Sequence, residues 1–187
     1  NQTMLWIGLM LGVLALVGLD QLTKWLATTY LMERPLVLIQ GVLELRYSEN
    51  EGAAWCIFSG ARWPLVVLTV VLMAAVIAML WSRRFRSYKL ATIAGGLILA
   101  GGVGNLIDRA VHGFVVDFIY VRWIDFPIFN VADCCVVIGA ALMLIFLMFV
   151  YREDDPPAGS DKSNGEEQAT DETGNMDGSA GTGGGAA

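Results

Sequence analysis

The sequence predicts an all-α membrane protein in which four transmembrane helices carry a small extracytoplasmic β-sheet subdomain. Of its 187 residues, 56% are hydrophobic, whereas soluble domains have roughly 45–50%. The mean hydropathy is +0.58. Four apolar segments approach the roughly 20 residues that a helix needs to cross the hydrocarbon of a bilayer. Between the first two, apolar and polar residues alternate, which is typical of strands.

The four apolar segments define the predicted membrane domain. Backbone groups in lipid must pair within their own segment, so runs of this length are interpreted as helices. No small-residue cleavage site follows the first run, which is therefore interpreted as a retained span and not as a signal peptide. The spans lie at about 4–26, 64–81, 90–107 and 131–151, within a domain of residues 1–151.

The loops predict the orientation of the chain and the place of the strands. Four bases lie within the eight residues SRRFRSYK between the second and third spans, and short loops this basic stay cytoplasmic. Both termini are then cytoplasmic, and the loops 27–63 and 108–130 face outward. The first of these loops alternates through residues 42–47, so the strands are expected there.

The net charge of −6 comes from the C-terminal tail. Residues 152–187 hold nine acids and two bases, and the rest of the chain holds nine acids and ten bases. The tail is rich in Gly, Ser, Asp and Glu without an apolar run, which predicts a disordered cytoplasmic segment. The sequence has no basic, aromatic face, which argues against nucleic acid as a partner.

Charged residues at the outer ends of the first and third spans need an explanation. A charge at the bilayer centre costs roughly 2.5–3.5 kcal/mol on insertion scales, so such residues usually have a partner or a function. Asp20 and Lys24 share one helix face and form either a surface ion pair or part of a site. Asn105, Asp108 and Arg109 lie on one side of a helix end. Arg109 could hold a carboxylate by two hydrogen bonds there, or the segment is an ordinary helix C-terminus.

Two more aspartates follow in the second outer loop and the fourth span. Asp117 lies in the apolar sequence GFVVDFIYV. Burial there would raise its pKa and keep it protonated, unless it is a strand residue that points to water. Asn130 suits a helix N-cap, and Asp133 falls in the first turn, where the helix dipole favours an ionised carboxylate. Such contrasting environments would let the two acids share one proton.

The first outer loop adds a candidate turn. Asn50 and Gly52 lie in ENEGAAW, whose amides could bind a carbonyl or an oxyanion, although an ordinary loop turn has the same pattern. His112, the only histidine, is interpreted as structural or solvent-facing. The three cysteines lack metal-binding spacing, so at most adventitious redox chemistry is expected of them.

Two functional hypotheses follow from these polar residues. A pair of aspartates can activate water, one as base and the other as acid, and then exchange roles. Alternatively, the chain is a small non-enzymatic membrane transporter or ion-binding protein. Its polar relay would consist of Asp20, Lys24, Asp108, Arg109 and Asp133. A purely structural membrane subunit would explain neither carboxylate of the first hypothesis.

Four short sequences resemble those of the lipoprotein signal peptidases (signal peptidase II), a family of bacterial aspartic peptidases. They are LDQLTKWL, NEGAAW, GNLIDR followed by VVDF, and FNVAD. One such sequence would be weak evidence, but four in this order among four spans are specific. The resemblance implies that Asp117 and Asp133 are the catalytic pair. The residues interpreted as binding the substrate or supporting the pair are Asp20, Lys24, Asn50, Gly52, Asn105, Asp108, Arg109 and Asn130.

By the same resemblance, the chain would remove signal peptides from diacylglyceryl-modified prolipoproteins by cutting before the lipidated Cys. Its site would lie at the outer face of the bacterial cytoplasmic (inner) membrane, in contact with membrane lipids, and the resemblance implies neither a metal nor an organic cofactor. Two features depart from the family's pattern. Trp55 replaces the usual Phe, and the acidic tail is additional.

Overall fold

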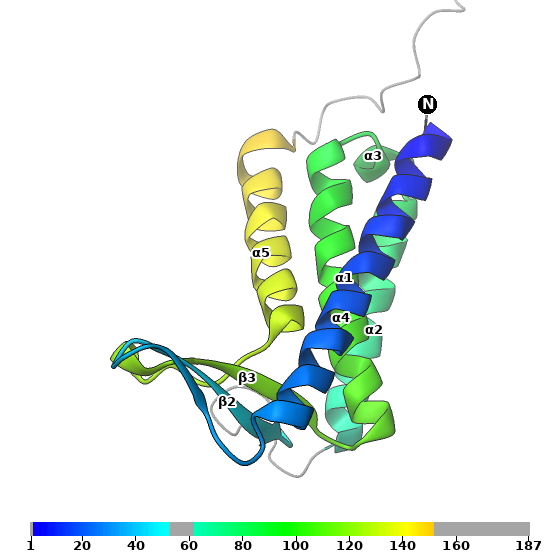
Figure 1. Cartoon of the computed structure of the whole chain (residues 1–187). Helices are drawn as coiled ribbons and strands as arrows, with labels where there is room; N and C mark the ends of the chain where they lie inside the picture. The colour runs from blue at the N-terminus through cyan, green and yellow to red at the C-terminus, as the bar shows by residue number, and fades with distance from the viewer. Residues whose placement is uncertain (1, 53–61, 152–187) are drawn as a thin grey trace, which may run out of the picture.

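The computed structural model describes residues 2–52 and 62–151 (Figure 1). The expectations for Trp55 and for the tail 152–187 lie outside the described residues. The elements are α1 (Gln2–Tyr30), β1 (Leu36–Ile39), β2 (Leu43–Asn50), α2 (Arg62–Trp81), α3 (Arg83–Arg86), α4 (Lys89–Val111), β3 (Val115–Val121), the 3-10 turn η2 (Arg122–Ile124), α5 (Val131–Ile145) and its π-helical continuation η3 (Phe146–Val150).

Four helices are long and apolar enough to cross a membrane, which confirms the predicted fold class. They are Thr3–Tyr30, Trp63–Trp81, Lys89–Val111 and Val131–Val150. Two helices extend beyond the predicted spans. α1 continues past residue 26 because Ala27 packs against the sheet residues Val116 and Phe118. α4 includes residues 108–111, which the sequence had assigned to the outer loop.

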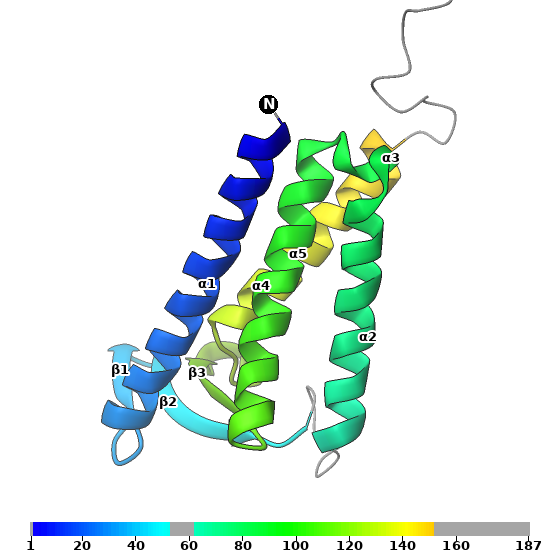
Figure 2. The ribbon, with the colours of Figure 1, turned by 90° about the vertical axis from the view of Figure 1, so that its right-hand side faces the viewer.

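The helix α4 is the centre of the bundle. It packs against α1, α2 and α5, as Figures 1 and 2 show. Helices approach closely where their contact faces have small residues, and the buried face of α4 is rich in glycine. The approach to α5 is so close that a Cβ on Gly101 would lie 2.2 Å from the carbonyl oxygen of Ala132. Away from the sheet, a cluster around Phe146 closes the packing of α4 and α5.

The two outer loops combine in one antiparallel sheet with the order β1-β2-β3. β1 and β2 lie in the first loop, as predicted. β3 comes from the second loop, where a strand was only the alternative interpretation of Asp117. In Figure 1 the sheet lies at the end of the bundle opposite the N-terminus and α3. The strand β3 thus carries Asp117 to the ends of the helices.

The contact between α4 and α5 gives a prediction about stability. Gly101→Ala is expected to lower the free energy of unfolding by about 1–3 kcal/mol, because the added methyl group meets the backbone of α5. Gly18→Ala is the matched control, since a Cβ there has no atom within 4 Å. Thermal unfolding of both variants in detergent measures the difference, and equal midpoints would contradict this account of the contact.

Candidate active site

Asp117 and Asp133 reach one site from different elements. Asp117 lies in β3 opposite Ser48 of β2 and is 2% exposed. Asp133 lies in the first turn of α5. Both line a cavity of about 920 Å³ at the junction of the helices and the sheet. The structure thus excludes the interpretation of Asp117 as a strand residue that points to water.

Asn130 connects the two carboxylates. Its side chain donates a hydrogen bond of 2.6 Å from Nδ2 to Oδ1 of Asp117. It also caps α5: its Oδ1 accepts from the amide of Asp133 at 2.9 Å, and its own amide donates to Oδ2 of Asp133 at 3.2 Å. This reciprocal cap fixes the Asp133 side chain relative to the helix. Because Asn130 is fully buried, it also sets the position of Asp117 relative to Asp133.

Each carboxylate has a further amide donor. Asn50 donates from Nδ2 to Oδ2 of Asp117 at 2.9 Å, and Asn105 donates from Nδ2 to Oδ1 of Asp133 at 2.7 Å. The amide of Gly52 donates to Oδ1 of Asn50 at 3.0 Å. This last bond holds the Asn50 side chain in place. It also gives the Gly52 amide an acceptor within the turn, and the binding of a carbonyl or an oxyanion by the amides of this turn stays a prediction.

A buried group of charges lies behind the site, between α1 and α4. Nζ of Lys24 lies 2.9 Å from Oδ2 of Asp20 and 3.0 Å from Oδ2 of Asp108. All three side chains are at most 3% exposed, which excludes a simple surface ion pair. Lys24 also donates to Oδ1 of Asn105 at 3.0 Å. Since Asn105 binds Asp133, one amide side chain connects the buried cation with the site.

The predicted group of Asn105, Asp108 and Arg109 divides between two environments. Asn105 and Arg109 line the cavity, whereas Asp108 points away from it toward α1 and the start of β3. Oδ2 of Asp108 accepts from the amide of Val116 at 3.0 Å. Among the described residues, no carboxylate makes the expected two-point contact with Arg109, whose guanidinium instead donates to the carbonyl of Gly52 at 3.3 Å. The prediction from helix periodicity, which placed all three residues on one side of the helix end, was therefore wrong for Asp108.

Gln21 belongs to the site's support and was missed in the sequence. Its Nε2 donates to Oδ1 of Asp108 at 3.0 Å, to the carbonyl of Gly104 at 3.2 Å and to Oδ2 of Asp20 at 3.3 Å. The only available signal was its place between two charged residues in LDQLTKWL. His112 is exposed and stacks on Phe114, in agreement with a solvent-facing role. Among residues 2–52 and 62–151, no group of three metal-ligating acids, histidines or cysteines occurs.

Burial makes Asp117 a weaker acid than an exposed aspartate. Its desolvation raises the pKa to about 7, and the nearby charge of Asp133 adds to this increase. Hydrogen bonds from Asn50 and Asn130 oppose it, as does the charge of Lys24. A carboxyl with a pKa near neutrality is able to donate a proton and to take it back at physiological pH.

The fold and the site define a class: a four-helix membrane protein with two amide-bound carboxylates at one cavity. The family model of signal peptidase (SPase) II matches residues 12–149. The chain therefore belongs to the signal peptidase II family, a family of bacterial membrane proteases.

Relatives and solved structures agree with this membership. The lipoprotein signal peptidase of Geobacillus thermodenitrificans is 40% identical over 132 residues, which cover 68% of this chain and 81% of the relative. That of Symbiobacterium thermophilum is 38% identical over 150 residues, 79% of this chain and 97% of the relative. Two solved structures, both described as bacterial membrane enzymes, have TM-scores of 0.68 and 0.67. Their sequence identities are 34% and 33%, and the matches cover 75% and 77% of this chain and 87% and 94% of theirs.

The buried charges behind the site give a second prediction. Lys24→Met is expected to lower the free energy of unfolding by about 3–5 kcal/mol, because it leaves Asp20 and Asp108 close together without their cation. Lys89→Met is the matched control, since Lys89 is exposed at the start of α4. Thermal unfolding in detergent compares the two. Similar losses for both variants would show that the buried ammonium does not stabilise the fold.

Proposed function

We propose that this chain is an aspartic endopeptidase that removes signal peptides from diacylglyceryl-modified prolipoproteins. The observation that carries the proposal is the shared cavity of Asp117 and Asp133, each held by amide donors. This arrangement suits two acids that pass protons to and from water and peptide. The similarity to lipoprotein signal peptidases supports the same substrate class.

In the proposed reaction, the ionised carboxylate of Asp133 takes a proton from a water molecule. The water oxygen attacks the carbonyl carbon of the scissile peptide, and protonated Asp117 donates its proton to the carbonyl oxygen. When the tetrahedral intermediate collapses, that proton returns to Asp117 and Asp133 protonates the leaving amine of the lipidated Cys. The helix N-terminus and the Asn105 amide favour the ionised form of Asp133. Burial favours the protonated form of Asp117.

The shape and lining of the cavity fit an apolar substrate segment. Toward the helices its walls come from α2, α4 and α5 and consist mainly of apolar side chains, with one hydroxyl. These residues are Thr69, Leu72, Met73, Ile98, Gly102, Val136 and Val137. A hydrophobic signal segment would lie against this wall. The two acyl chains of the substrate, each CH₂ contributing about 0.8 kcal/mol when buried in lipid, would hold the cleavage point at the bilayer surface.

The proposed orientation places the sheet and the site at the outer face of the bacterial cytoplasmic membrane, with both termini inside. The basic connection around α3 lies at the opposite end of the bundle from the sheet, which supports this orientation. The alternative of a polar relay is less well supported. The segments 3–19, 63–81, 90–104 and 134–150 contain no Asp, Glu, Lys or Arg, so the charges do not extend across the bilayer.

Substitution of the two aspartates tests the proposed mechanism. Asp117→Asn and Asp133→Asn are each expected to lower kcat for a diacylglyceryl-modified precursor by at least about 10³-fold, because either change removes a proton-transfer group. Both variants should still insert and unfold as the wild type does. Glu33→Gln, in an exposed loop, is the control and should retain activity. Turnover near the wild-type rate by either aspartate variant would rule out the paired mechanism.

The pKa of Asp117 predicts the pH dependence of cleavage. Because the pKa lies at about 7, the proposed acid is protonated below neutrality and loses its proton as the pH rises. The value of kcat/KM should therefore fall above about pH 7, and again at acidic pH when both carboxyls are protonated. Asn50→Ala removes a hydrogen bond that lowers this pKa, so the alkaline limb should move to higher pH. An unchanged limb in the purified Asn50→Ala variant would contradict the assignment of the acid.

A further inference from the structure

A second, polar cavity lies on the sheet beside the first. It has a volume of about 420 Å³. Four of its lining residues, Ser48, Phe126, Pro127 and Ile128, also line the cavity of the two aspartates, so the two spaces adjoin. The residues particular to the second cavity are Arg46, Tyr47, Tyr120 and Asp125. None of these takes part in the proposed proton transfers.

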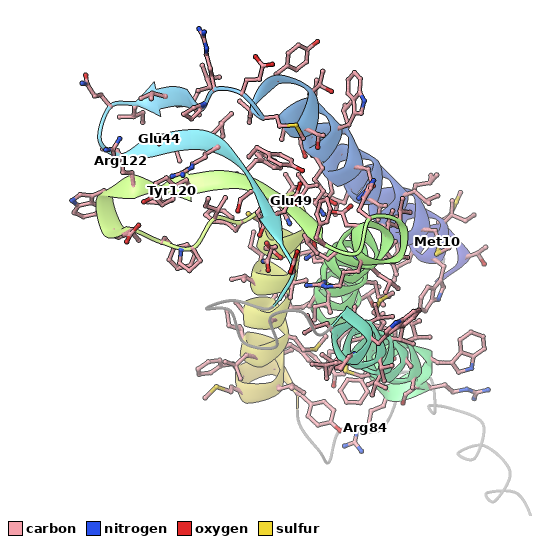
Figure 3. All side chains as sticks on the ribbon, turned by 90° about the horizontal axis from the view of Figure 1, so that it is seen from below. Met10, Glu44, Glu49, Arg84, Tyr120 and Arg122 are labelled. Atoms are coloured by element: carbon pink, nitrogen blue, oxygen red, sulfur yellow. The ribbon has the colours of Figure 1, made fainter. Side chains whose placement is uncertain are left out.

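The strand register gives this second cavity a place relative to the scissile bond. Ser48 pairs with Asp117, and Arg46 comes two residues earlier in β2. A strand rises about 3.3 Å per residue, so Arg46 lies roughly two residues of an extended peptide from Asp117. The register shifts between Leu45 and Ser48. Such a bulge redirects side chains locally. In Figure 3, Glu49 lies near the helices, whereas Tyr120 lies further out along the sheet.

The charged residues around the second cavity differ in whether they have an ion-pair partner. Asp125 accepts a hydrogen bond of 2.5 Å from the hydroxyl of Tyr120, and the hydroxyl of Tyr47 donates to Glu49 at 2.9 Å. The guanidinium of Arg122 forms an ion pair with Glu44. Arg46 is exposed, and in the described part of the chain it forms no ion pair. Arg46 thus lines the cavity as a cation that no carboxylate contacts directly, with Asp125 as the acidic residue of the same lining.

We propose that this second cavity binds the first residues of the mature lipoprotein and that Arg46 favours an acidic side chain at the second or third of them. The inference rests on the proposed function, which places the signal segment along the helices and the cleavage point at the two aspartates. The polypeptide after the lipidated Cys then continues along the sheet, where the adjoining cavity is polar and open to an extended chain. Arg46 is the cation in the lining of this cavity with which a substrate carboxylate can pair.

The test compares purified, full-length protein on synthetic diacylglyceryl-modified precursor peptides. They differ only at the second and third positions of the mature segment, which are Asp, Asn or Lys. The wild type should cleave the Asp peptide with a kcat/KM about two- to fivefold above that for the Lys peptide, as expected for a solvent-exposed ion pair. The preference should weaken in high salt. Arg46→Glu should reverse the order of the Asp and Lys peptides.

Arg34→Glu is the matched control, because it makes the same change of charge at an exposed loop residue of the outer region outside the cavity. It should keep the wild-type order of peptides. Cleavage of all peptides at equal rates by the wild type, or an order unchanged by Arg46→Glu, would overturn the proposed role of Arg46 and leave the peptidase proposal standing. Failure of the wild type to cleave any lipidated peptide would overturn both.

Discussion

The buried ammonium of Lys24 is the interaction on which the site depends. It lies between the carboxylates of Asp20 and Asp108 and so joins α1 to α4. Each of those carboxylates has a second partner in the outer part of the molecule: Asp20 binds the amide of Ala132 at the start of α5, and Asp108 binds the amide of Val116 in β3. A buried charge without a partner is strongly unfavourable, so the three charged groups must stay together. These contacts hold β3, which carries Asp117, and α5, which carries Asp133, to the same group of buried charges.

Much of this molecule could be predicted from its sequence, because unpaired polar groups are energetically unfavourable in the bilayer and few structures avoid them. Apolar runs have few interpretations other than spanning helices, and polar residues among them, such as Asp20 and Lys24, indicate a site or a partner. The role of Asn130 as a helix cap could also be predicted, since capping depends on residues that are neighbours in sequence. These features are local, and the structure contains them as expected.

The remaining features depend on contacts between distant segments. β3 pairs with β2 across some 70 residues, and this pairing buries Asp117. Helix periodicity placed Asp108 and Arg109 together with Asn105. Whether each points to the cavity, to α1 or to the turn at Gly52 depends on where the neighbouring elements lie. Gln21 could not be recognised because an uncharged amide beside an aspartate has no distinctive pattern, although it binds three groups of the support.

Close packing at Gly104 explains how the Asp20 carboxylate fits beside the start of α5. A Cβ on Gly104 would lie 2.5 Å from Oδ2 of Asp20 and 3.1 Å from Cβ of Ala132. Only a residue without a side chain leaves room for the Asp20 carboxylate between α4 and the first turn of α5. Asp20 and Asn130 accept from two of the free amides of that turn, so side chains of the protein satisfy this part of the helix N-terminus. Its dipole also acts on Asp133, which lies in the same turn, and favours a negative charge on this carboxylate.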